Sequence, residues 1–233
     1  MTILGITPAR GGSKGVPRKN VKLLAGKPLL QHTVDAARGC LLIDRYVVNT
    51  EDAEIRAVAE GLGVETQSRP EDFWHDNTFQ EVDRLLQWAV RDLEARGDKI
   101  SMVVLLYPTS PLRRTRHITD CIDLILHHDF DSALTLREDR SYIWRHTNDG
   151  QSAPVNYDPQ KRGPNQLEGW NQWIENKAVY AVKRDLLLDT GCRLGGRIGS
   201  VEMSKLDSID IDQPEDFQLA EAIMQLRADG RLT

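Results

Sequence analysis

A chain of 233 residues, 40% of them hydrophobic, has room for one large domain and enough apolar side chains to build its core. A formal net charge of −5 argues against a general nucleic-acid binder, which needs a broad basic field. An apolar run of about 20 residues, the length that a membrane-spanning helix needs, is absent from the sequence. These features favour one globular domain over residues 1–233, with neither nucleic acid nor a membrane as its partner.

The apolar patterns along the chain alternate between two periods. Runs that fit buried strands are 3–7, 45–50, 64–68, 102–107, 132–136 and 178–182. Segments with apolar residues at helical spacing are 27–40, 52–63, 77–96, 115–127 and 214–226. Strands that alternate with helices pair in parallel through right-handed crossovers. The sequence therefore predicts a three-layer α/β fold around a mainly parallel sheet.

The segment 137–175 breaks this alternation. It is polar, contains Gly and Pro, and holds three of the five tryptophans, Trp144, Trp170 and Trp173. A structureless loop of this length is unusual in a compact domain. We therefore predict an inserted hairpin or arm that packs on the sheet edge or on a second subunit.

The cysteines and the N-terminal stretch indicate the cellular compartment of the protein. Cys40, Cys121 and Cys192 lie far apart and match neither a disulfide framework nor a zinc spacing. The stretch MTILGITPAR lacks the basic start, apolar centre and cleavage site of a secretory signal. We expect reduced thiols and a cytoplasmic location.

A glycine-rich basic loop follows the first predicted strand. From Arg10 to Lys22 there are five basic residues and no acidic one. Loops after the strands of an open α/β sheet are favoured ligand sites. Gly11, Gly12 and Gly15 let the backbone turn its N–H groups toward an anion. The loop predicts a polyphosphate cradle, although it is neither a Walker A loop nor a dinucleotide fingerprint; a solvated basic loop is the alternative.

Two carboxylates near the other end of the chain form a second pattern. Asp210 and Asp212 are two residues apart, so they share one face of an extended strand. Hard oxygen ligands on one face suit Mg²⁺ that bridges phosphate oxygens. Capping of the helix 214–226 by Asp212 is the alternative explanation of this pattern.

The loop PARGGSKGVPRKN, residues 8–20, resembles the signature loop of the acylneuraminate cytidylyltransferases, the CMP-sialic acid synthetase family. Further matching blocks follow in the family's order: RYVVNTED at 45–52, RPEDF at 69–73, LLYPTSPLR at 105–113 and DSIDIDQPEDF at 207–217. The resemblance implies a Rossmann-like nucleotidyltransferase sandwich whose inserted arm serves dimerisation, so a homodimer is expected. It implies an enzyme that joins CMP from CTP to an acidic α-keto sugar with Mg²⁺ and releases pyrophosphate.

The resemblance also implies roles for individual residues. Its nucleotide-binding positions are Ala9, Arg10, Gly11, Ser13, Lys14, Asn20, Arg69, Thr78 and Gln80. Its catalytic positions are Arg10, Lys19 and Asp212, and its metal ligands are Asp210 and Asp212. Lys19 is expected to stabilise the departing pyrophosphate, because such transfers depend on positioning and electrostatic stabilisation. Asp212 has a further implied part as a base or orienting group for the sugar hydroxyl.

The residues that depart from the family pattern are at positions that the resemblance places near the acceptor. Tyr107 replaces a Gln, and Lys177 replaces a Gly in the block NKAVY at 176–180. An arginine that typically precedes this block has no counterpart in register; Gln166 falls at its spacing and Arg162 is the nearest cation. The acceptor could therefore be an N-acylneuraminate, another nonulosonate, a deoxy-octulosonate or a phosphonate. A non-catalytic nucleotide-binding module is the remaining alternative, and the retained carboxylate pair argues against it.

Overall fold

A central sheet organises the protein in a computed structural model that describes residues 2–12, 15–73, 81–161 and 170–232. Its strands are β1 (Thr2–Pro8), β4 (Arg45–Thr50), β5 (Glu65–Ser68), β6 (Ile100–Leu105), β7 (Ser132–Glu138), β10 (Trp173–Lys183) and β11 (Ile198–Glu202). The helices are α1 (Leu29–Arg38), α2 (Ala53–Gly61), α3 (Glu81–Ala95), α4 (Thr115–His127), α5 (Arg184–Thr190) and α6 (Pro214–Ala228). Short strands pair as β2 (Leu23–Leu24) with β3 (Lys27–Pro28), and β8 (Trp144–His146) with β9 (Ser152–Pro154).

The strand order is β11-β7-β10-β6-β1-β4-β5 within the described residues. All neighbouring pairs are parallel except those that involve β10, which runs antiparallel to both β6 and β7. The reversal arises because β7 leaves the sheet into the inserted segment and β10 returns from it, without a crossover helix. The predicted α/β fold with a mainly parallel sheet is thus confirmed.

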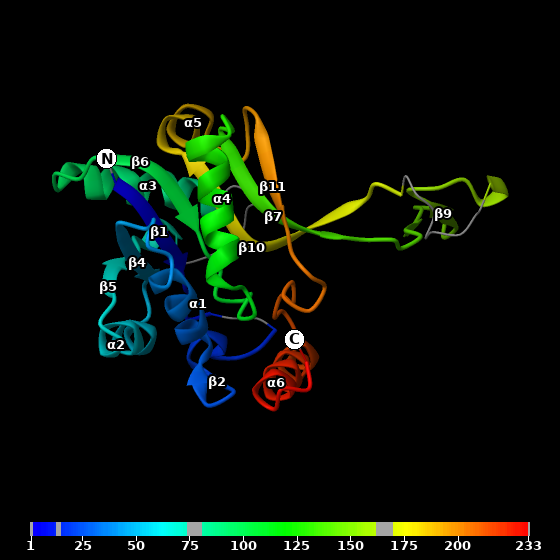
Figure 1. Cartoon of the computed structure of the whole chain (residues 1–233), viewed down its shortest axis with the longest axis horizontal. Helices are drawn as coiled ribbons and strands as arrows, with labels where there is room; N and C mark the ends of the chain where they lie inside the picture. Colours follow the sequence, from blue (N-terminus) through cyan, green and yellow to red (C-terminus); the bar gives the residue numbers. More distant parts are fainter. Residues whose placement is uncertain (1, 13–14, 74–80, 162–169, 233) are drawn as a thin grey trace.

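Side chains of β6 alternate between the two faces of the sheet and define the layers. Met102 and Val104 pack in the cluster that includes residues of α1 and α4, whereas Val103 and Leu105 pack with residues of α3 and α5. This period of two is that of a strand buried on both sides. In Figure 1, α4 and α3 accordingly lie on opposite faces of the sheet. None of the described helices has the length and apolar character that crossing a membrane needs.

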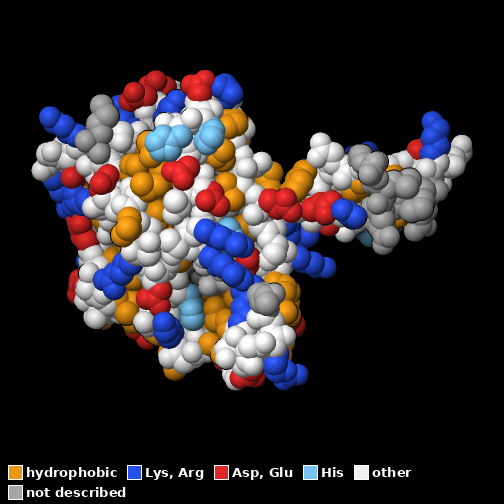
Figure 2. Space-filling model, viewed as in Figure 1, with side chains coloured by type: hydrophobic (Ala, Val, Ile, Leu, Met, Phe, Trp, Pro, Cys, Tyr) orange, Lys and Arg blue, Asp and Glu red, His pale blue; other side chains and the backbone are white. Residues whose placement is uncertain are grey.

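The inserted segment projects from the body of the molecule as an extended arm (Figure 1). Its base is a two-stranded ladder in which Trp173 pairs with Glu138, and its outer part contains the β8–β9 pair. Aromatic rings pack along it, for example Tyr142 and Tyr157 at 4.5 Å between centroids. Hydrophobic side chains lie beside acidic ones where the arm leaves the body in Figure 2.

A separate apolar cluster joins the two ends of the chain. It packs Val16 of the basic loop against Ile211 and against Phe217 of α6, and all three side chains are buried. Since Ile211 lies between Asp210 and Asp212, burial of this cluster places the aspartates beside the basic loop.

Candidate functional site

A cleft of ≈ 370 Å³ opens at the carboxyl ends of β1 and β6. Its lining includes six residues predicted from the sequence: Arg10, Lys19, Asn20, Arg69, Asp210 and Asp212. Tyr107 and Lys177, the two described residues that depart from the family pattern, line the same cleft. The basic loop and the aspartate pair therefore converge on one cleft.

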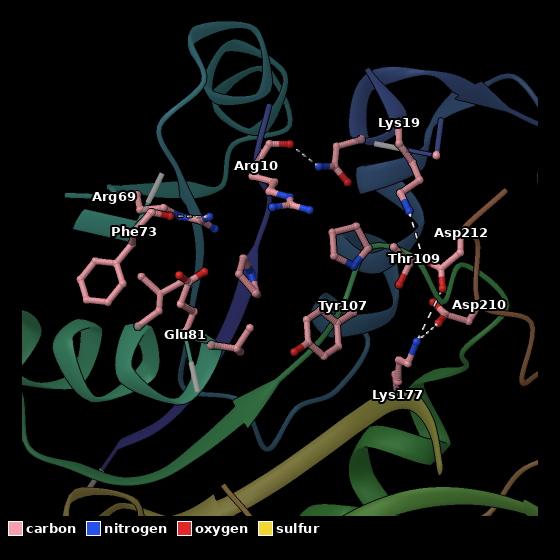
Figure 3. A pocket seen from close by; sticks show the side chains of 16 residues that line it. Arg10, Lys19, Arg69, Phe73, Glu81, Tyr107, Thr109, Lys177, Asp210 and Asp212 are labelled. Carbon is pink, nitrogen blue, oxygen red and sulfur yellow. Dashed lines mark hydrogen bonds and ion pairs between the residues drawn. The ribbon is translucent and has the colours of Figure 1, made fainter. Parts of the chain in front are cut away.

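Lys19 links these two parts directly. Its ammonium donates a hydrogen bond to the carbonyl oxygen of Ile211, and its Nζ lies 3.7 Å from Oδ1 of Asp212 (Figure 3). Lys19 is only 9% exposed, so its hydrogen bond to Ile211 is buried, whereas the ion pair reaches a solvent-exposed Asp212. Asn20, the next residue, donates from Nδ2 to the carbonyl oxygen of Arg10 at 2.9 Å and thereby fixes the start of the loop.

Gly15 marks the closest approach of the basic loop to the aspartates. A Cβ built on this residue would collide with the carbonyl oxygen of Asp212, which is backbone and has little freedom to move. The backbone at Gly12, three residues earlier, has open space around the same position. Glycine is therefore required at 15 for packing between the two halves of the site.

We expect Gly15→Ala to push the loop away from Asp212, to lower the melting temperature and to weaken CTP binding about tenfold or more. The overpacking alone is worth roughly 1–3 kcal/mol. Thermal unfolding and calorimetric titration with CTP measure both effects. Gly12→Ala is the matched control in the same loop; equal behaviour of the two variants would contradict the packing explanation.

Asp210 and Asp212 present their carboxylates to the cleft. Oδ2 of Asp210 accepts a hydrogen bond from Nζ of Lys177 at 2.8 Å, and Oδ2 of Asp212 lies 3.6 Å from the same nitrogen. The hydrogen bond to Asp210 raises the pKa of Lys177. Asp212 does not cap the helix, because the N-cap of α6 is Gln213, whose backbone N–H donates to Oδ2 of Asp216 in the first turn at 2.8 Å.

The donor set fits a magnesium ion that is shared with a substrate. Oδ1 of Asp210 is buried and accepts no hydrogen bond from the residues that the structure describes. A buried carboxylate oxygen without a donor is costly unless a cation reaches it. Across the described ranges, no group of three or more His, Cys, Asp or Glu side chains could form a protein cage for a metal. Mg²⁺ suits such an open site, since it commonly binds one or two carboxylates, substrate phosphates and water.

The opposite end of the cleft is built around Arg69. Its Nε donates to Oδ1 of Asn49 at 3.0 Å and lies 3.6 Å from Oε2 of Glu51. Figure 3 shows Arg69 near Phe73 and Glu81, across the cleft from Lys19 and Asp212. These contacts fix the guanidinium at the carboxyl end of β4, where the resemblance assigns the cytidine.

Two predicted nucleotide-binding residues do not line the cleft. Ala9 is fully buried, and its backbone N–H donates to the carbonyl oxygen of Asn49 at 2.9 Å. Gly11 donates its backbone N–H to Oε1 of Glu51 at 2.7 Å, so this donor faces a carboxylate in the present structure. The other predicted positions that were drawn from the resemblance, Ser13, Lys14, Thr78 and Gln80, lie outside the described residues, as do Arg162 and Gln166.

Arg18 anchors the basic loop to the start of α2. Its backbone is in the left-handed region, with φ of 54°, and its guanidinium donates to both carboxylate oxygens of Asp52 at 2.6 and 3.0 Å. Asp52 also caps α2 by accepting the backbone N–H groups of Glu54 and Ile55, both at 3.0 Å. The bonds from Arg18, together with those from the helix N-terminus, lower the pKa of Asp52 to about 2.

We expect Asp52 to contribute pH-dependent stability. Its pKa in the unfolded chain is about 3.9, so the contribution is fully present above pH 4 and is lost as the pH falls toward about 2. Asp52→Asn keeps a capping side chain but removes the charge, whereas Asp52→Ala also removes the cap and costs about 1 kcal/mol more. Urea unfolding at pH 6 and at pH 2.5 measures the free energy of unfolding of each variant. A difference in this free energy between wild type and Asp52→Asn that is the same at both pH values would contradict the assignment.

Some residues that line the cleft were not predicted. Pro108 and Thr109 lie three and four residues after the end of β6, and the carbonyl of Thr109 accepts the N–H of Ile211 at 2.8 Å. Their place after a buried strand could have indicated them, by the rule that pointed to the basic loop. Val82 and Leu85 of α3 line the other wall. Sequence gives no sign of this role, because apolar residues at helical spacing usually face the core.

Comparisons with known proteins agree with this site. The family model described as cytidylyltransferase matches residues 4–230. N-acylneuraminate cytidylyltransferase A of Danio rerio is 29% identical over 216 residues, which cover 91% of this chain and 48% of the relative. The N-acylneuraminate cytidylyltransferase of Escherichia coli is 30% identical over 229 residues, which cover 96% of this chain and 52% of the relative. This chain thus spans about half the length of these curated relatives.

A relative of similar length also matches. CMP-N,N'-diacetyllegionaminic acid synthase of Legionella pneumophila is 30% identical over an alignment 255 positions long, which covers 99% of each chain.

Solved structures share the fold. One is a CMP:2-keto-3-deoxy-manno-octonic acid synthetase complexed with CTP, with a TM-score of 0.70, 16% identity and coverage of 97% of this chain and 100% of that one. Another is a 4-diphosphocytidyl-2C-methyl-D-erythritol synthase, with a TM-score of 0.70, 13% identity and coverage of 96% and 98%. The predicted nucleotidyltransferase architecture is confirmed by these likenesses. With a family model that matches nearly the whole sequence, the chain belongs to the cytidylyltransferase family.

Proposed function

We propose that this protein transfers CMP from CTP to an acidic α-keto sugar of the nonulosonate class, with release of pyrophosphate and with Mg²⁺. The observation that carries the proposal is the convergence of Lys19, Asp210 and Asp212 in one cleft. Relatives named for N-acylneuraminate and for N,N'-diacetyllegionaminic acid support this acceptor class.

The residues of the cleft divide the work of the transfer. Arg10 and Lys19 place positive charge where the triphosphate would lie, and Lys19 would stabilise the negative charge that develops on pyrophosphate. Ser13 and Lys14 belong to the same proposed triphosphate site. Fixed charge of this kind acts strongly in a cleft that excludes water, and needs no reorganisation during the reaction.

The carboxylates would act on the other side of the α-phosphate. Asp210 and Asp212 would hold Mg²⁺, which when bound neutralises phosphate charge and orients the phosphate oxygens. Asp212 is the more exposed of the two, with 60% of its side chain accessible against 19% for Asp210. We assign to Asp212 the additional task of orienting the acceptor hydroxyl or taking its proton.

The cytidine would lie at the end of the cleft that contains Arg69 and Asn20. Phe73 offers an aromatic face there, and Arg69 is held rigidly by Asn49. The family resemblance also assigns Thr78 and Gln80 to nucleotide binding, and both lie outside the described residues.

We also propose that the arm joins two copies of the chain. Trp144, Val155 and Trp173 are 50%, 55% and 41% exposed, which is unusual for large apolar residues on a projecting segment. Homodimer interfaces are rich in such residues. Light scattering of the purified protein tests this, and a monomeric mass at micromolar concentration would contradict it.

A pyrophosphate-release assay tests the catalytic proposal. The reaction contains Mg²⁺, one of the four nucleoside triphosphates, and an acceptor from a panel of N-acylneuraminate, legionaminate, deoxy-octulosonate and a phosphonate. We expect release with CTP and a nonulosonate only. Release with only deoxy-octulosonate or only the phosphonate would assign that compound as the acceptor in place of a nonulosonate. The absence of release with every triphosphate would indicate a non-catalytic binding module.

A further inference from the structure

Lys177 stands at an irregularity in β10 that faces the cleft. The pairing register between β10 and β7 shifts between Glu175 and Tyr180, as in a β-bulge. Within this irregularity Lys177 has a φ of 59°, in the left-handed region that non-glycine residues seldom adopt. A strained backbone kept in place by its surroundings is a frequent mark of a functional site.

Buried hydrogen bonds hold both sides of this bulge. Asn176 accepts at Oδ1 from Thr135 at 2.6 Å and donates from Nδ2 to Ser208 at 3.0 Å, two residues before Asp210. The guanidinium of Arg113 donates to the carbonyl oxygen of Ala178 at 2.6 Å and to that of Tyr107 at 3.1 Å. These bonds therefore fix the bulge relative to the segment that carries the aspartates and relative to Tyr107.

The side chain of Lys177 points at the aspartate pair (Figure 3). Its Nζ is 2.8 Å from Oδ2 of Asp210 and 3.6 Å from Oδ2 of Asp212. Lys19 reaches Asp212 at Oδ1 from the other side, at 3.7 Å. Two ammonium groups thus face two carboxylates. The oxygen left over is Oδ1 of Asp210, which is buried and has no hydrogen-bond partner among the described residues.

We propose that the Lys177 ammonium is a tethered cation that occupies one side of the aspartate pair, so that the site binds a single divalent ion with CTP. This inference rests on the proposed function. Asp210 would help to hold the divalent ion, whereas Lys177 stays beside the Oδ2 atoms of both aspartates. Since a second divalent ion on those atoms would meet the ammonium at contact distance, repulsion between like charges excludes it.

Counting bound Mn²⁺ tests this inference without turnover. Mn²⁺ and CTP are added in the absence of an acceptor, and equilibrium dialysis with electron paramagnetic resonance gives the number of Mn²⁺ ions for each bound CTP. We compare the wild type with Lys177→Gly and Lys177→Met. Glycine accepts the left-handed backbone and removes the charge, and methionine removes the charge while it keeps the length of the side chain. Thermal unfolding verifies that each variant is folded.

The matched control is Lys183→Met. Lys183 pairs with Asp131 at the same 2.8 Å distance and is similarly exposed, but lies outside the cleft. We expect one Mn²⁺ for each CTP in the wild type and in Lys183→Met, and two in both Lys177 variants. Two ions in the wild type, or one in every variant, would overturn the inference. Absence of CTP binding to any of the proteins would instead count against the proposed function.

Discussion

Asp210→Asn is expected to lower the rate of pyrophosphate release by about 10²–10³-fold, the loss typical when one electrostatic contact to the transition state is removed. The substitution keeps the shape of the side chain and removes the charge that would hold Mg²⁺. Lys177 also loses its 2.8 Å carboxylate partner. We expect the free energy of unfolding to change by less than about 1 kcal/mol, because the ion pair that is lost involves a half-exposed lysine and the buried Oδ1 has no hydrogen bond to lose within the described structure. Steady-state kinetics with CTP and urea unfolding measure the two effects.

Asp185→Asn provides the comparison for this variant. Asp185 pairs with Arg184 at 2.8 Å, but its side chain is 81% exposed and lies outside the cleft. We expect wild-type kinetics from it. Retention of full Mg²⁺-dependent activity by Asp210→Asn would remove this carboxylate from the catalytic site and, with it, the proposed position of the metal.

Lys19→Met is expected to reduce kcat by a similar factor, about 10²–10³, while the KM for CTP rises less. The reason is that the charge of Lys19 is proposed to act mainly on pyrophosphate as it departs, rather than on CTP in the ground state. Methionine keeps much of the apolar stem in its buried position. The carbonyl of Ile211 loses its donor, which costs roughly 1–3 kcal/mol of stability if water cannot replace it.

Comparison with Lys22→Met separates charge at this position from charge on the loop in general. Lys22 belongs to the same basic stretch, but its Nζ lies over the ring of Phe217 at 4.6 Å from the centroid. We expect a small effect on kcat from Lys22→Met. A loss of activity in Lys19→Met that merely follows the fraction of unfolded protein would assign Lys19 a structural task only.

Elements with strong local signals were predicted closely. The bounds predicted for β4 and α4, 45–50 and 115–127, coincide with the observed ones. Asp52, the first residue of the helix predicted over 52–63, is the N-cap of α2. The general place of the site followed from the same reasoning, since ligands in such sheets bind at the carboxyl ends of the strands.

Other features depended on contacts that local patterns do not encode. α5 has seven residues, and β11 is an edge strand with an exposed glycine-containing stretch, so neither gave a clear periodic signal. The direction of β10 is set by the return of the arm, and the orientation of Lys177 by the bulge and its hydrogen bonds to distant residues. Asp212 does not cap α6, because the N-cap position belongs to Gln213, whose N–H pairs with Asp216 of the first turn.

The contact between Lys19 and Ile211 spans 192 positions of the sequence, and it bears on how this protein matures. Closing a contact over so many positions costs chain entropy, so long-range contacts of this kind form late, after the intervening strands and helices are ordered. The cation-rich turn and its acidic counterpart should therefore come together in one of the last steps of folding. A partly folded chain should lack the completed cleft even where most of its sheet has formed.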